Sequence, residues 1–439
     1  MASERQTLSL AEVYDFSSGL SKPRSEFGFG YPFLSFKDVF YNSAVPKQIT
    51  ELVQSTEQER ARCSVMRGDV FLTRTSETMD ELGMSSVALA DIPDATFNGF
   101  TKRLRPKRDL IAPGFARYFF RSPEFRAAVN SMSTMSTRAS LNNEMLERLT
   151  ITFPEYAEQE AIAHVLGTLD DKIELNRKMN ETLEAMAQAL FKSWFVDFDP
   201  VRAKAEGRDP GLPAHIAALF PDSFEESELG EIPMGWKWIP FANTVEIMGG
   251  GTPKTSVAAY WDGDIPWFSV VDAPSASDVW TINTEKKITR AGAENSSTKV
   301  LAERTTIISA RGTVGRVALV GVPMAMNQSC YGLRGLTGAL GTFTYFATRN
   351  AVSLLQQGAH GSVFDTITRE SFMGVHVALP PDALVDAYEQ MVESRLQRIR
   401  SSLFQSRTLA SLRDVLLPKL ISGEIRVDQA ERVVSEAGA

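Results

Sequence analysis

The chain contains the same kind of segment twice, and this internal repeat limits the folds that it can adopt. In its 439 residues, YPFLS at 31–35 matches IPWFS at 265–269 at an offset of 234. Farther along, FP at 153–154 matches LP at 379–380 at an offset of 226. A sequence that resembles itself at a fixed spacing builds one structural unit more than once. The repeat therefore predicts two related α/β blocks, each followed by a proline-marked entry into a long helix.

Further matches between the halves support the repeat. VMRGDVFLTRTS at 65–76 resembles VLAERTTIISARGT at 300–313, because each is an apolar, strand-like run that leads to an arginine with hydroxyl neighbours. Near the start of each copy a Lys/Pro pair follows a glycine, and this alignment sets Gly19 opposite Gly251.

The glycine-rich stretch GGGTPKTS at 249–256 resembles a phosphate-binding loop at first sight. That loop has glycine directly before its lysine. Here Pro253 takes that place, and proline has no N–H to offer a phosphate. The stretch is better explained as a turn between two short strands, near the start of the second repeat.

Two long helices are expected, over 155–199 and 381–417. Alternating steps of four and three residues in the first helix form a heptad seam, and two asparagines occupy seam positions. The second helix starts with Asp382 as a candidate N-cap and is predicted to end at Pro418. Each helix could pack on its own block, but two matched seams favour pairing with each other. The expected pairing residues are Ile162, Leu166, Leu169, Ile173, Asn176, Asn180, Leu183, Leu190, Leu396, Ile399 and Leu403.

These patterns predict a mixed α/β (α+β) protein with two globular domains in pseudo-two-fold tandem repeat and two long antiparallel coiled-coil helices. The segment 200–235 is rich in proline, glycine and acidic residues, which is typical of a linker with one short helix. The expected parts are a first domain (1–154), a central helix (155–199), the linker (200–235), a second domain (236–380), a distal helix (381–417) and a C-terminal tail (418–439).

Composition restricts the class of protein. With 43% apolar and 23% charged residues, the chain can build real cores. No apolar run approaches the roughly 18 residues of a membrane span, and the N-terminus lacks the pattern of a signal peptide. The two cysteines, Cys63 and Cys330, belong to no metal-ligand spacing. A cytoplasmic protein is expected.

The net charge of −8 is concentrated in one segment. Residues 156–230 hold 15 acidic and 7 basic side chains, which accounts for the whole acidic excess. The two blocks are close to neutral, so each can still present a basic face to DNA. Weak overall attraction predicts modest non-specific DNA affinity for the isolated chain.

Catalytic and metal-binding patterns are not found in the sequence. A DNA methyltransferase needs a glycine-rich cofactor loop and a Pro-Pro-aromatic catalytic motif, whereas LPPD at 379–382 has no aromatic after its prolines. PDSFEESELG at 221–230 has the carboxylates of a metal nuclease but no lysine. No catalytic residue, metal site or cofactor is therefore expected in this chain. The histidines are scattered, at His164, His215, His360 and His376.

Several segments resemble the specificity subunit of type I restriction–modification systems, and the resemblance covers nearly the whole chain. The segments are GDVFLTRTSET (68–78), SWFVDFDPVRAKAEG (193–207), LFPDSFEESELGEIPMGW (219–236), GGGTPKTSVAAYWDGDIPWFS (249–269) and LLPKLISGEIRV (416–427).

The resemblance implies a non-catalytic reader of double-stranded DNA that takes part in phage defence. Each block would be a target-recognition domain for one half of a bipartite, asymmetric site. Half-sites about one DNA turn, roughly 34 Å, apart suit such a repeat. The paired helices would bind two methyltransferase subunits, which restriction and motor subunits then join. S-adenosylmethionine, Mg²⁺ and ATP are expected on those partners, and base flipping is expected on the methyltransferase.

Loops that follow strands are the best places for base readers. Arginine can read guanine, and Ser, Thr and Lys can contact bases or phosphates, although each can also be a solvated charge or a turn residue. Trp261 and Trp267 could stack on DNA, but packing in a strand core is favoured. The predicted DNA contacts are Lys22, Arg24, Arg74, Thr75, Ser76, Lys102, Arg103 and Arg138 in the first domain, and Lys254, Thr255, Ser256, Tyr260, Arg311, Thr313, Arg316, Ser362 and Arg369 in the second.

Two alternatives remain open from the sequence. One is a diverged, stand-alone DNA-modifying or DNA-cutting enzyme. The other is a coiled-coil scaffold that pairs other proteins without touching DNA. Both would account for the helices, but neither accounts for a duplicated α/β block whose loops differ.

Overall fold

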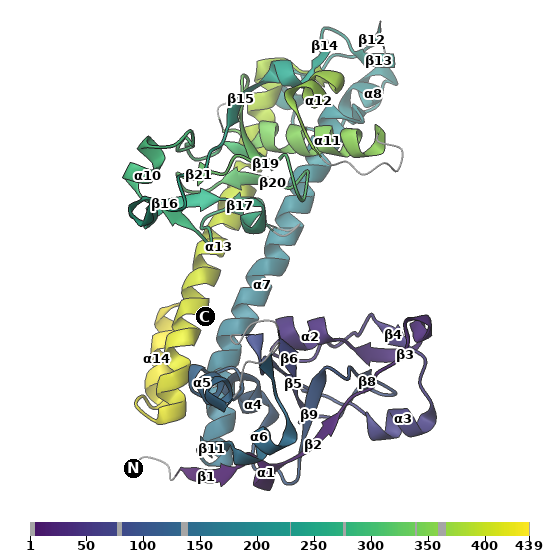
Figure 1. Ribbon diagram of the computed structural model, residues 1–439. Helices are drawn as coiled ribbons and strands as arrows, with labels where there is room; N and C mark the ends of the chain where they lie inside the picture. The colour runs from purple at the N-terminus through teal and green to yellow at the C-terminus, as the bar shows by residue number, and fades with distance from the viewer. Residues whose placement is uncertain are drawn as a thin grey trace. The chain divides into compact units, whose positions relative to one another are not determined.

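The computed structural model describes residues 5–76, 81–132, 139–228, 230–274, 278–338, 340–358 and 366–438. The chain divides into two compact units (Figure 1). Unit 1 comprises Met1–Ile173 and Thr408–Ala439, and unit 2 comprises Glu174–Arg407. Each unit therefore holds one α/β repeat together with part of both long helices.

Unit 1 is built around two small sheets. The first has the order β2-β9-β5-β7, with all neighbours antiparallel, and the second has the order β4-β3-β8. Every residue of β5 is buried, so this strand lies at the centre of the unit. The strands are β2 (Tyr14–Ser18), β9 (Thr101–Pro106), β5 (Val70–Thr73), β7 (Ser85–Val87), β4 (Leu52–Val53), β3 (Phe27–Leu34) and β8 (Thr96–Phe97).

Short helices and two further strand pairs complete unit 1. A serine, threonine or asparagine side chain caps several of these helices, because it accepts a hydrogen bond from a backbone N–H of the first turn that has no partner within the helix. The elements are β1 (Gln6–Ser9) paired with β11 (Thr150–Phe153), β6 (Thr75–Ser76) paired with β10 (Ala139–Ser140), α1 (Leu10–Val13), α2 (Phe36–Tyr41), α3 (Glu57–Arg62), α4 (Pro113–Phe119), α5 (Pro123–Met132) and α6 (Asn143–Arg148).

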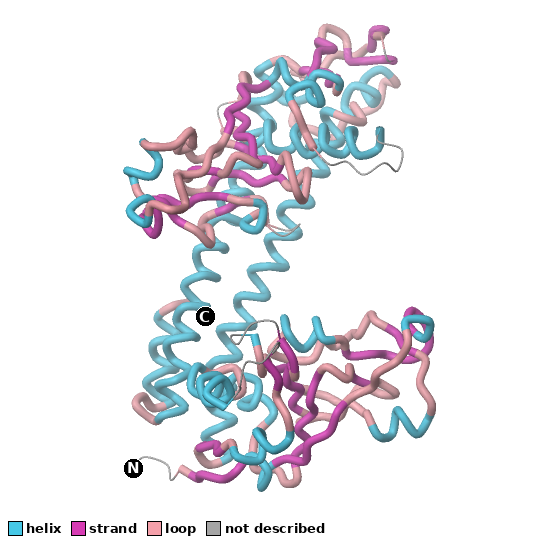
Figure 2. The backbone as a smooth tube through the Cα atoms, in the orientation of Figure 1, coloured by secondary structure: helices cyan, strands magenta, loops and turns pink. Residues whose placement is uncertain are grey.

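Unit 2 repeats this plan with one more strand. Its main sheet has the order β15-β22-β19-β20-β17, and its second sheet has the order β18-β16-β21. Figure 2 marks the strands in magenta and the helices in cyan. The strands are β15 (Val245–Gly249), β22 (Cys330–Gly335), β19 (Thr306–Ser309), β20 (Val317–Val320), β17 (Trp280–Thr281), β18 (Lys287–Ile288), β16 (Trp261–Phe268) and β21 (Ala325–Met326). The other elements are α8 (Asp199–Ala205), α9 (Ala214–Ala217), α10 (Arg290–Glu294), α11 (Thr342–Gly358), α12 (Arg369–Gly374), β12 (Phe224–Ser227) paired with β13 (Gly230–Pro233), and β14 (Lys237–Pro240) paired with β23 (His376–Leu379).

The predicted repeat is confirmed at the level of strand register. Strands β3 and β16 have equal length and lie 234 residues apart, as the YPFLS and IPWFS match requires. Both carry the same irregularity, in which two residues of the long strand oppose one residue of its partner: Phe27 and Tyr31 oppose Val53, and Trp261 and Ile265 oppose Ile288. A register shift shared at the same position of the strand is a detailed structural feature, so the two units have the same architecture.

The structure shifts one part of the predicted alignment. A Cβ on Gly19 would lie 2.2 Å from the carbonyl oxygen of Phe97, and a Cβ on Gly250 would lie 2.0 Å from that of Asn327. The equivalent of Gly19 is therefore Gly250, not Gly251. The stretch at 249–256 thus needs a glycine because two backbone segments approach closely there, and not to hold a phosphate.

Neighbouring glycines allow a direct test of this close approach. Changing Gly250 to Ala should lower the free energy of unfolding by about 1–3 kcal/mol, because the added methyl group has no space. The matched control is Gly249→Ala, where the added Cβ meets nothing within 4 Å. Chemical denaturation of the two variants measures the difference. Equal stability would contradict the packing described here.

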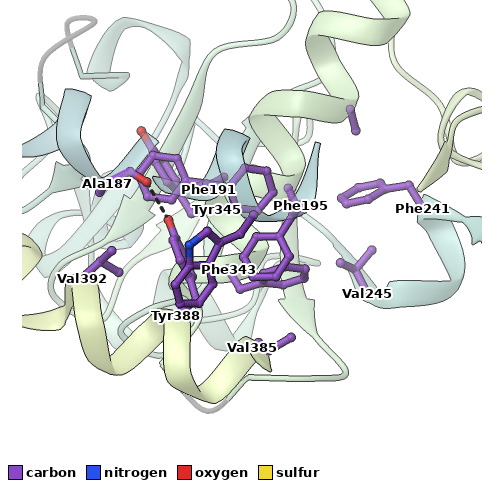
Figure 3. Close-up of a cluster of buried hydrophobic side chains, with 14 of the residues drawn as sticks. Ala187, Phe191, Phe195, Phe241, Val245, Phe343, Tyr345, Val385, Tyr388 and Val392 are labelled. Atoms are coloured by element: carbon purple, nitrogen blue, oxygen red, sulfur yellow. Dashed lines mark hydrogen bonds between the residues drawn. The ribbon is translucent and has the colours of Figure 1, made fainter. Parts of the chain in front are cut away.

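The long helices α7 (Tyr156–Phe195) and α13 (Asp382–Ser422) pair with each other in both units. In unit 2 the Tyr388 hydroxyl donates to the Ala187 carbonyl at 3.0 Å, and Asn176 Nδ2 donates to Gln405 Oε1 at 3.0 Å. Figure 3 shows Phe191 and Phe195 of α7 beside Tyr388 of α13. The residue with the higher number in α7, Ala187, contacts the residue with the lower number in α13, Tyr388. The two helices therefore run antiparallel, as predicted.

In unit 1 the pairing continues with different residues. Arg413 Nη1 lies 2.6 Å from Asp170 Oδ1, and Leu409 shares a core with the seam residues of α7. The predicted seam residues Ile162, Leu166, Leu169, Asn176, Asn180, Leu396 and Ile399 are buried, and Ile173, Leu183, Leu190 and Leu403 are half-buried.

Helix α13 continues through Pro418, where the sequence predicted its end. A proline inside a helix removes one backbone hydrogen bond. Leu416 and Leu420 are buried in the core of unit 1 on either side of the proline. Burial of these apolar side chains offsets the lost bond. A short helix, α14 (Val427–Glu436), follows.

The segment 200–235 is more ordered than the expected linker. It contains all of α8 except the first residue, Asp199, and also α9 and the β12–β13 hairpin. Val201, Ile216 and Phe220 are buried in the core of unit 2. These widely spaced apolar residues anchor the segment to the core of unit 2, although its overall composition is typical of a linker.

Candidate nucleic-acid interface

Three loops of unit 1 meet at the end of strand β5. The backbone N–H of Arg74 donates to the Phe100 carbonyl at 2.9 Å, and the Arg74 carbonyl accepts from the N–H of Leu141 at 2.8 Å. The next residues, Thr75 and Ser76, pair with β10 in the backbone. The predicted contacts Arg74, Thr75 and Ser76 therefore lie together, on a framework fixed by backbone hydrogen bonds. We call this site the β5 edge.

Unit 2 builds the same framework with other residues. Ala310 N–H donates to the Ser329 carbonyl at 2.8 Å, and Ile367 N–H donates to the Ala310 carbonyl at 2.9 Å. Arg311 then forms a bridge with Thr366, as Thr75 pairs with Ser140 in unit 1. The sequence Arg74-Thr75-Ser76 thus corresponds to Ala310-Arg311-Gly312. We call this site the β19 edge.

Lys102 lies behind the β5 edge rather than on its surface. Its side chain is buried, and Nζ donates to Ser18 Oγ at 3.0 Å and to Asn143 Oδ1 at 2.7 Å. Burial lowers the pKa of Lys102, and the nearby Arg74 guanidinium lowers it further. The half-buried Arg74 is consequently the cation of this pair with access to solvent.

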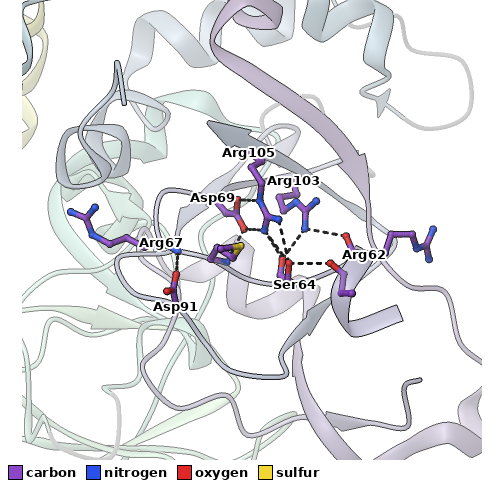
Figure 4. A network of polar contacts seen from close by, with 9 residues as sticks. Arg62, Ser64, Arg67, Asp69, Asp91, Arg103 and Arg105 are labelled. Atoms are coloured by element: carbon purple, nitrogen blue, oxygen red, sulfur yellow. Dashed lines mark hydrogen bonds and ion pairs between the residues drawn. The ribbon is translucent and has the colours of Figure 1, made fainter. Parts of the chain in front are cut away.

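Arg103 is also buried, and its contacts hold the fold of unit 1. Its Nη1 donates to the carbonyls of Arg62 at 3.2 Å and Ser64 at 2.8 Å (Figure 4). Beside it, Arg105 forms a bidentate ion pair with Asp69, in which Nε lies 2.8 Å from Oδ1 and Nη2 lies 2.6 Å from Oδ2. Burial is the main cause that lowers the pKa of the Arg103 guanidinium, and the positive charge of Arg105 also lowers it. This environment is that of a structural arginine.

The other predicted residues of unit 1 differ in their exposure. Lys22 forms ion pairs with Glu26 and Glu59, each at 2.9 Å, which balance its charge. Both carboxylates raise the pKa of Lys22, and the hydrogen bond to Glu59 has the larger effect. Arg24 is exposed at the start of a short 3-10 helix. Arg138 lies outside the described residues.

In unit 2 the predicted residues Lys254, Thr255 and Ser256 are exposed on the loop that follows β15. This loop is attached to the β21–β22 turn, because Thr252 Oγ1 donates to Gln328 and Gly251 N–H donates to the Met326 carbonyl at 3.0 Å. The half-buried Tyr260 closes the same loop. The three exposed side chains are therefore carried near the β19 edge.

Three more predicted residues follow β19. Arg311, Thr313 and Arg316 are all exposed on the β19–β20 hairpin. Arg369 begins α12, and its Nη2 donates to the Ile247 carbonyl at 3.0 Å. Ser362 lies outside the described residues. Trp267 is buried and meets Trp261 edge to face at 5.2 Å, so core packing is confirmed for Trp267.

Phe100 is a candidate DNA contact that the sequence reasoning missed. Its side chain is 59% exposed although it sits on a tightly held turn. The Asn98 side chain accepts the N–H of Phe100 at 2.7 Å, and the Asn98 carbonyl accepts the Thr101 hydroxyl at 2.7 Å. The equivalent residue of unit 2 is Ser329. An Asn-Gly-aromatic turn directly before a strand was the available signal.

Replacing Phe100 by Ser gives unit 1 the side chain that unit 2 carries. If the ring contacts a base, selectivity at one base pair of the target should fall by about 1–3 kcal/mol. Methylation rates on single-base variants of the target measure this. Phe29→Ser is the control, because Phe29 is 53% exposed and lies five residues, about 16 Å, along β3 from the Leu34 carbonyl that binds this turn. Unchanged selectivity in Phe100→Ser would remove Phe100 from the interface.

The described residues contain no group of three or more His, Cys, Asp or Glu side chains placed to hold a metal ion. No helix among them is long and apolar enough to cross a membrane.

A duplicated α/β scaffold whose equivalent loops carry different side chains is the design of a recognition protein with two reading modules. The family described as "Type I restriction modification DNA specificity domain" matches this chain twice, over residues 3–185 and 233–385. The chain therefore belongs to the type I restriction–modification DNA specificity family.

Curated relatives span nearly the whole chain. The Type I restriction enzyme HindI specificity subunit of Haemophilus influenzae is 25% identical, covering 94% of this chain and 98% of its own length. The Type I restriction enzyme MjaIX specificity subunit of Methanocaldococcus jannaschii is 24% identical, with coverages of 96% and 92%. The crystal structure of the type I restriction–modification S subunit from M. genitalium shares the fold, with a TM-score of 0.53 at 12% identity and coverages of 95% and 96%.

Family membership resolves the alternatives that the sequence left open. The chain is a specificity subunit, which belongs to the DNA-recognition part of a type I system and not to its catalytic part. The interpretations as a stand-alone enzyme or as a scaffold without a DNA-recognition role are therefore set aside.

Proposed function

We propose that this chain reads a bipartite, asymmetric DNA target, with unit 1 reading one half-site and unit 2 the other. One observation carries the proposal: the β5 edge and the β19 edge share their backbone hydrogen bonds but present Arg74-Thr75-Ser76 and Ala310-Arg311-Gly312. A shared backbone framework places Arg74 and Thr75 like Ala310 and Arg311, and different side chains select different bases. The two half-sites then differ in sequence.

The chain directs catalytic partners to this target. Two methyltransferase subunits bind the paired helices and modify an adenine, and restriction and motor subunits join that core. S-adenosylmethionine, Mg²⁺ and ATP belong to those partners, whereas this chain holds no cofactor of its own. A protein that works on cellular and incoming DNA acts in the cytoplasm. The exposed apolar side chains Leu175 and Met186 on α7 support a role for this helix in partner binding.

A methylation map tests the proposal. The chain is expressed with its neighbouring methyltransferase in a host without adenine methylation, and the DNA is sequenced by a method that reports modified bases. Complete methylation of one split, asymmetric motif is expected. Methylation without a split motif, or no methylation although both proteins form a complex, would contradict the proposed reading role.

A further inference from the structure

Unit 1 contains a cavity of about 410 Å³ whose wall is rich in arginine. Arg117, Arg121 and Arg126 reach it from α4, α5 and the turn between them, and Arg413 reaches it from α13. Asp170 and Asp414 also line it, as do Met84 and the exposed Tyr41. We call it the arginine cavity.

Asp170 balances only part of this positive charge. Its carboxylate lies 2.8 Å from Arg117 Nη2 and 2.6 Å from Arg413 Nη1, and it accepts the Tyr118 hydroxyl at 2.7 Å. Asp414 adds a second carboxylate, 2.9 Å from Arg413 Nη2, so Arg117 and Arg413 share two carboxylates.

Arg121 has no counter-charge among the described residues. Its Nε donates to the Ser85 carbonyl at 2.7 Å, and its Nη2 donates to the carbonyls of Val39 at 3.1 Å and Phe40 at 2.9 Å. Carbonyl oxygens fix the guanidinium but carry no negative charge. Burial, as the larger cause, and the neighbouring arginines together lower the pKa of Arg121 to about 10. The positive charge of Arg121 is therefore fixed in place without a negatively charged partner among the described residues.

Unit 2 has an equivalent cavity of about 230 Å³. Gly83 N–H donates to the Thr73 carbonyl in unit 1, and Gly315 N–H donates to the Ser309 carbonyl in unit 2. The next residues therefore correspond, and these are Met84 and Arg316, which line the two cavities.

The two cavities differ in their internal charge balance. In unit 2 the cavity arginine from α11 is Arg349, and it forms an ion pair with Glu184, whose side chain is 5% exposed. Unit 2 thus supplies a carboxylate from within its own fold. In unit 1, α13 places Arg413 at the cavity together with its ion-pair partner Asp414. The buried Arg121 of unit 1, in contrast to Arg349, has only carbonyl partners and no carboxylate among the described residues.

We propose that the arginine cavity of unit 1 binds an oxyanion, and that this anion is a backbone phosphate of the bound DNA. The inference rests on the proposed DNA-reading function and adds a phosphate site to it. Guanidinium groups match the geometry of phosphate oxygens and remain charged at neutral pH. A site of this kind positions the duplex without reading its sequence.

The position of the cavity favours DNA over a protein carboxylate. Met84 forms its rim, and the Met84 carbonyl accepts the N–H of Thr73, the last residue of β5. The next residue is Arg74, at the β5 edge. Bases contacted at that edge bring their own phosphates close to the same strand end. The corresponding rim residue of unit 2, Arg316, is an exposed cation.

Met84 offers a substitution that fills the site without removing an arginine. Met84→Glu places a carboxylate at the rim, and Met84→Gln is the neutral control of equal size. Position 316 already carries a long charged side chain on the equivalent backbone, so both variants should fold. In the complex with the methyltransferase, Met84→Glu should bind target DNA about tenfold more weakly than Met84→Gln. The slope of log affinity against log salt should decrease by about one.

A second pair of variants separates local occupancy from general repulsion. Leu89 is 42% exposed beyond the far end of β7 from Met84. Leu89→Glu and Leu89→Gln make the same charge change about 16 Å away, and they should differ little in affinity and slope. The melting temperature should be higher for Met84→Glu than for Met84→Gln, because the new carboxylate supplies the missing anion.

Three results would overturn the phosphate site. The first is equal DNA affinity and slope for the two Met84 variants. The second is an equal loss for both glutamate variants, which would indicate long-range repulsion. The third is weaker assembly with the methyltransferase at an unchanged salt slope, measured by mass in solution, which would assign the cavity to a partner carboxylate. The methylated motif of the unmodified chain tests the reading function separately.

Discussion

Exchanging residues 1–154 for the equivalent segment of another family member should replace one half of the methylated motif and leave the other half unchanged. The β5 edge lies wholly inside this segment, and the β19 edge lies wholly outside it. No side chain of unit 2 is altered, so the base contacts of unit 2 are retained. The change should be all-or-none, because every predicted reader of unit 1 is replaced at once.

The fold sets where this exchange must end. Strands β1 and β11 pair from Gln6 opposite Phe153 to Ser9 opposite Thr150. A junction at residue 150 would divide this pair, whereas a junction after Pro154 keeps it within one parent. The donor must also supply the groups that meet α7, since Arg117 and Tyr118 both contact Asp170.

The reciprocal exchange is the matched control. Replacing residues 236–380 should change the other half-site alone, and the methylation map reads both results in the same way. Changes in both halves after either exchange would show that the two units do not read independently, and the modular interpretation would fail.

The repeat and the long helices could be predicted because apolar side chains recur in them at regular positions. YPFLS and IPWFS keep their residue types since both end a strand that enters a capped turn, with Ser35–Asp38 and Ser269–Asp272 forming the same capping box. The seam of α7 was visible for the same reason.

The environment of the cations could not be predicted. Lys102 and Arg103 are adjacent on β9, and the sequence suggested that both were available to DNA. Both are buried, because residues far away in sequence cover both faces of the strand: Asn143 binds Lys102, and the carbonyls of Arg62 and Ser64 bind Arg103. Such partners depend on tertiary structure, which local pattern does not encode.

Backbone requirements were also hidden. The assignment of Gly250 as the equivalent of Gly19 depends on carbonyl groups that approach from β8 and β21. Phe100 was overlooked since its exposure follows from a turn fixed by Asn98 and not from its residue type.

Adding one heptad to each long helix should lengthen the spacer of the DNA motif by about three base pairs and leave both half-sites intact. Seven helical residues span about 10.5 Å, against about 3.4 Å for each base pair. They also return the helix to nearly the same face, with a drift of about 20°. The insertions belong after Ile173 in α7 and after Arg407 in α13, where the two units divide.

These positions preserve the helix contacts inside each unit. On the unit 2 side, Asn176 contacts Gln405 and Ser406, and on the unit 1 side, Asp170 contacts Arg413. Because α7 and α13 run antiparallel, equal insertions between these contacts keep each pair in register. Both cores should therefore remain intact, and circular dichroism should report an unchanged or slightly higher helix content.

A single insertion in α7 alone is the control. It adds seven residues to one helix of the pair, so α13 can no longer match both groups of contacts. Buried seam residues such as Leu169 or Ile399 would lose their partners, at a cost of about 2–5 kcal/mol for each large side chain left without packing. Methylation should then be lost. The decisive comparison is the spacer length of the motif in the doubly extended chain: a longer spacer assigns the measuring role to the helices, and an unchanged spacer with full methylation assigns it to the methyltransferase partners.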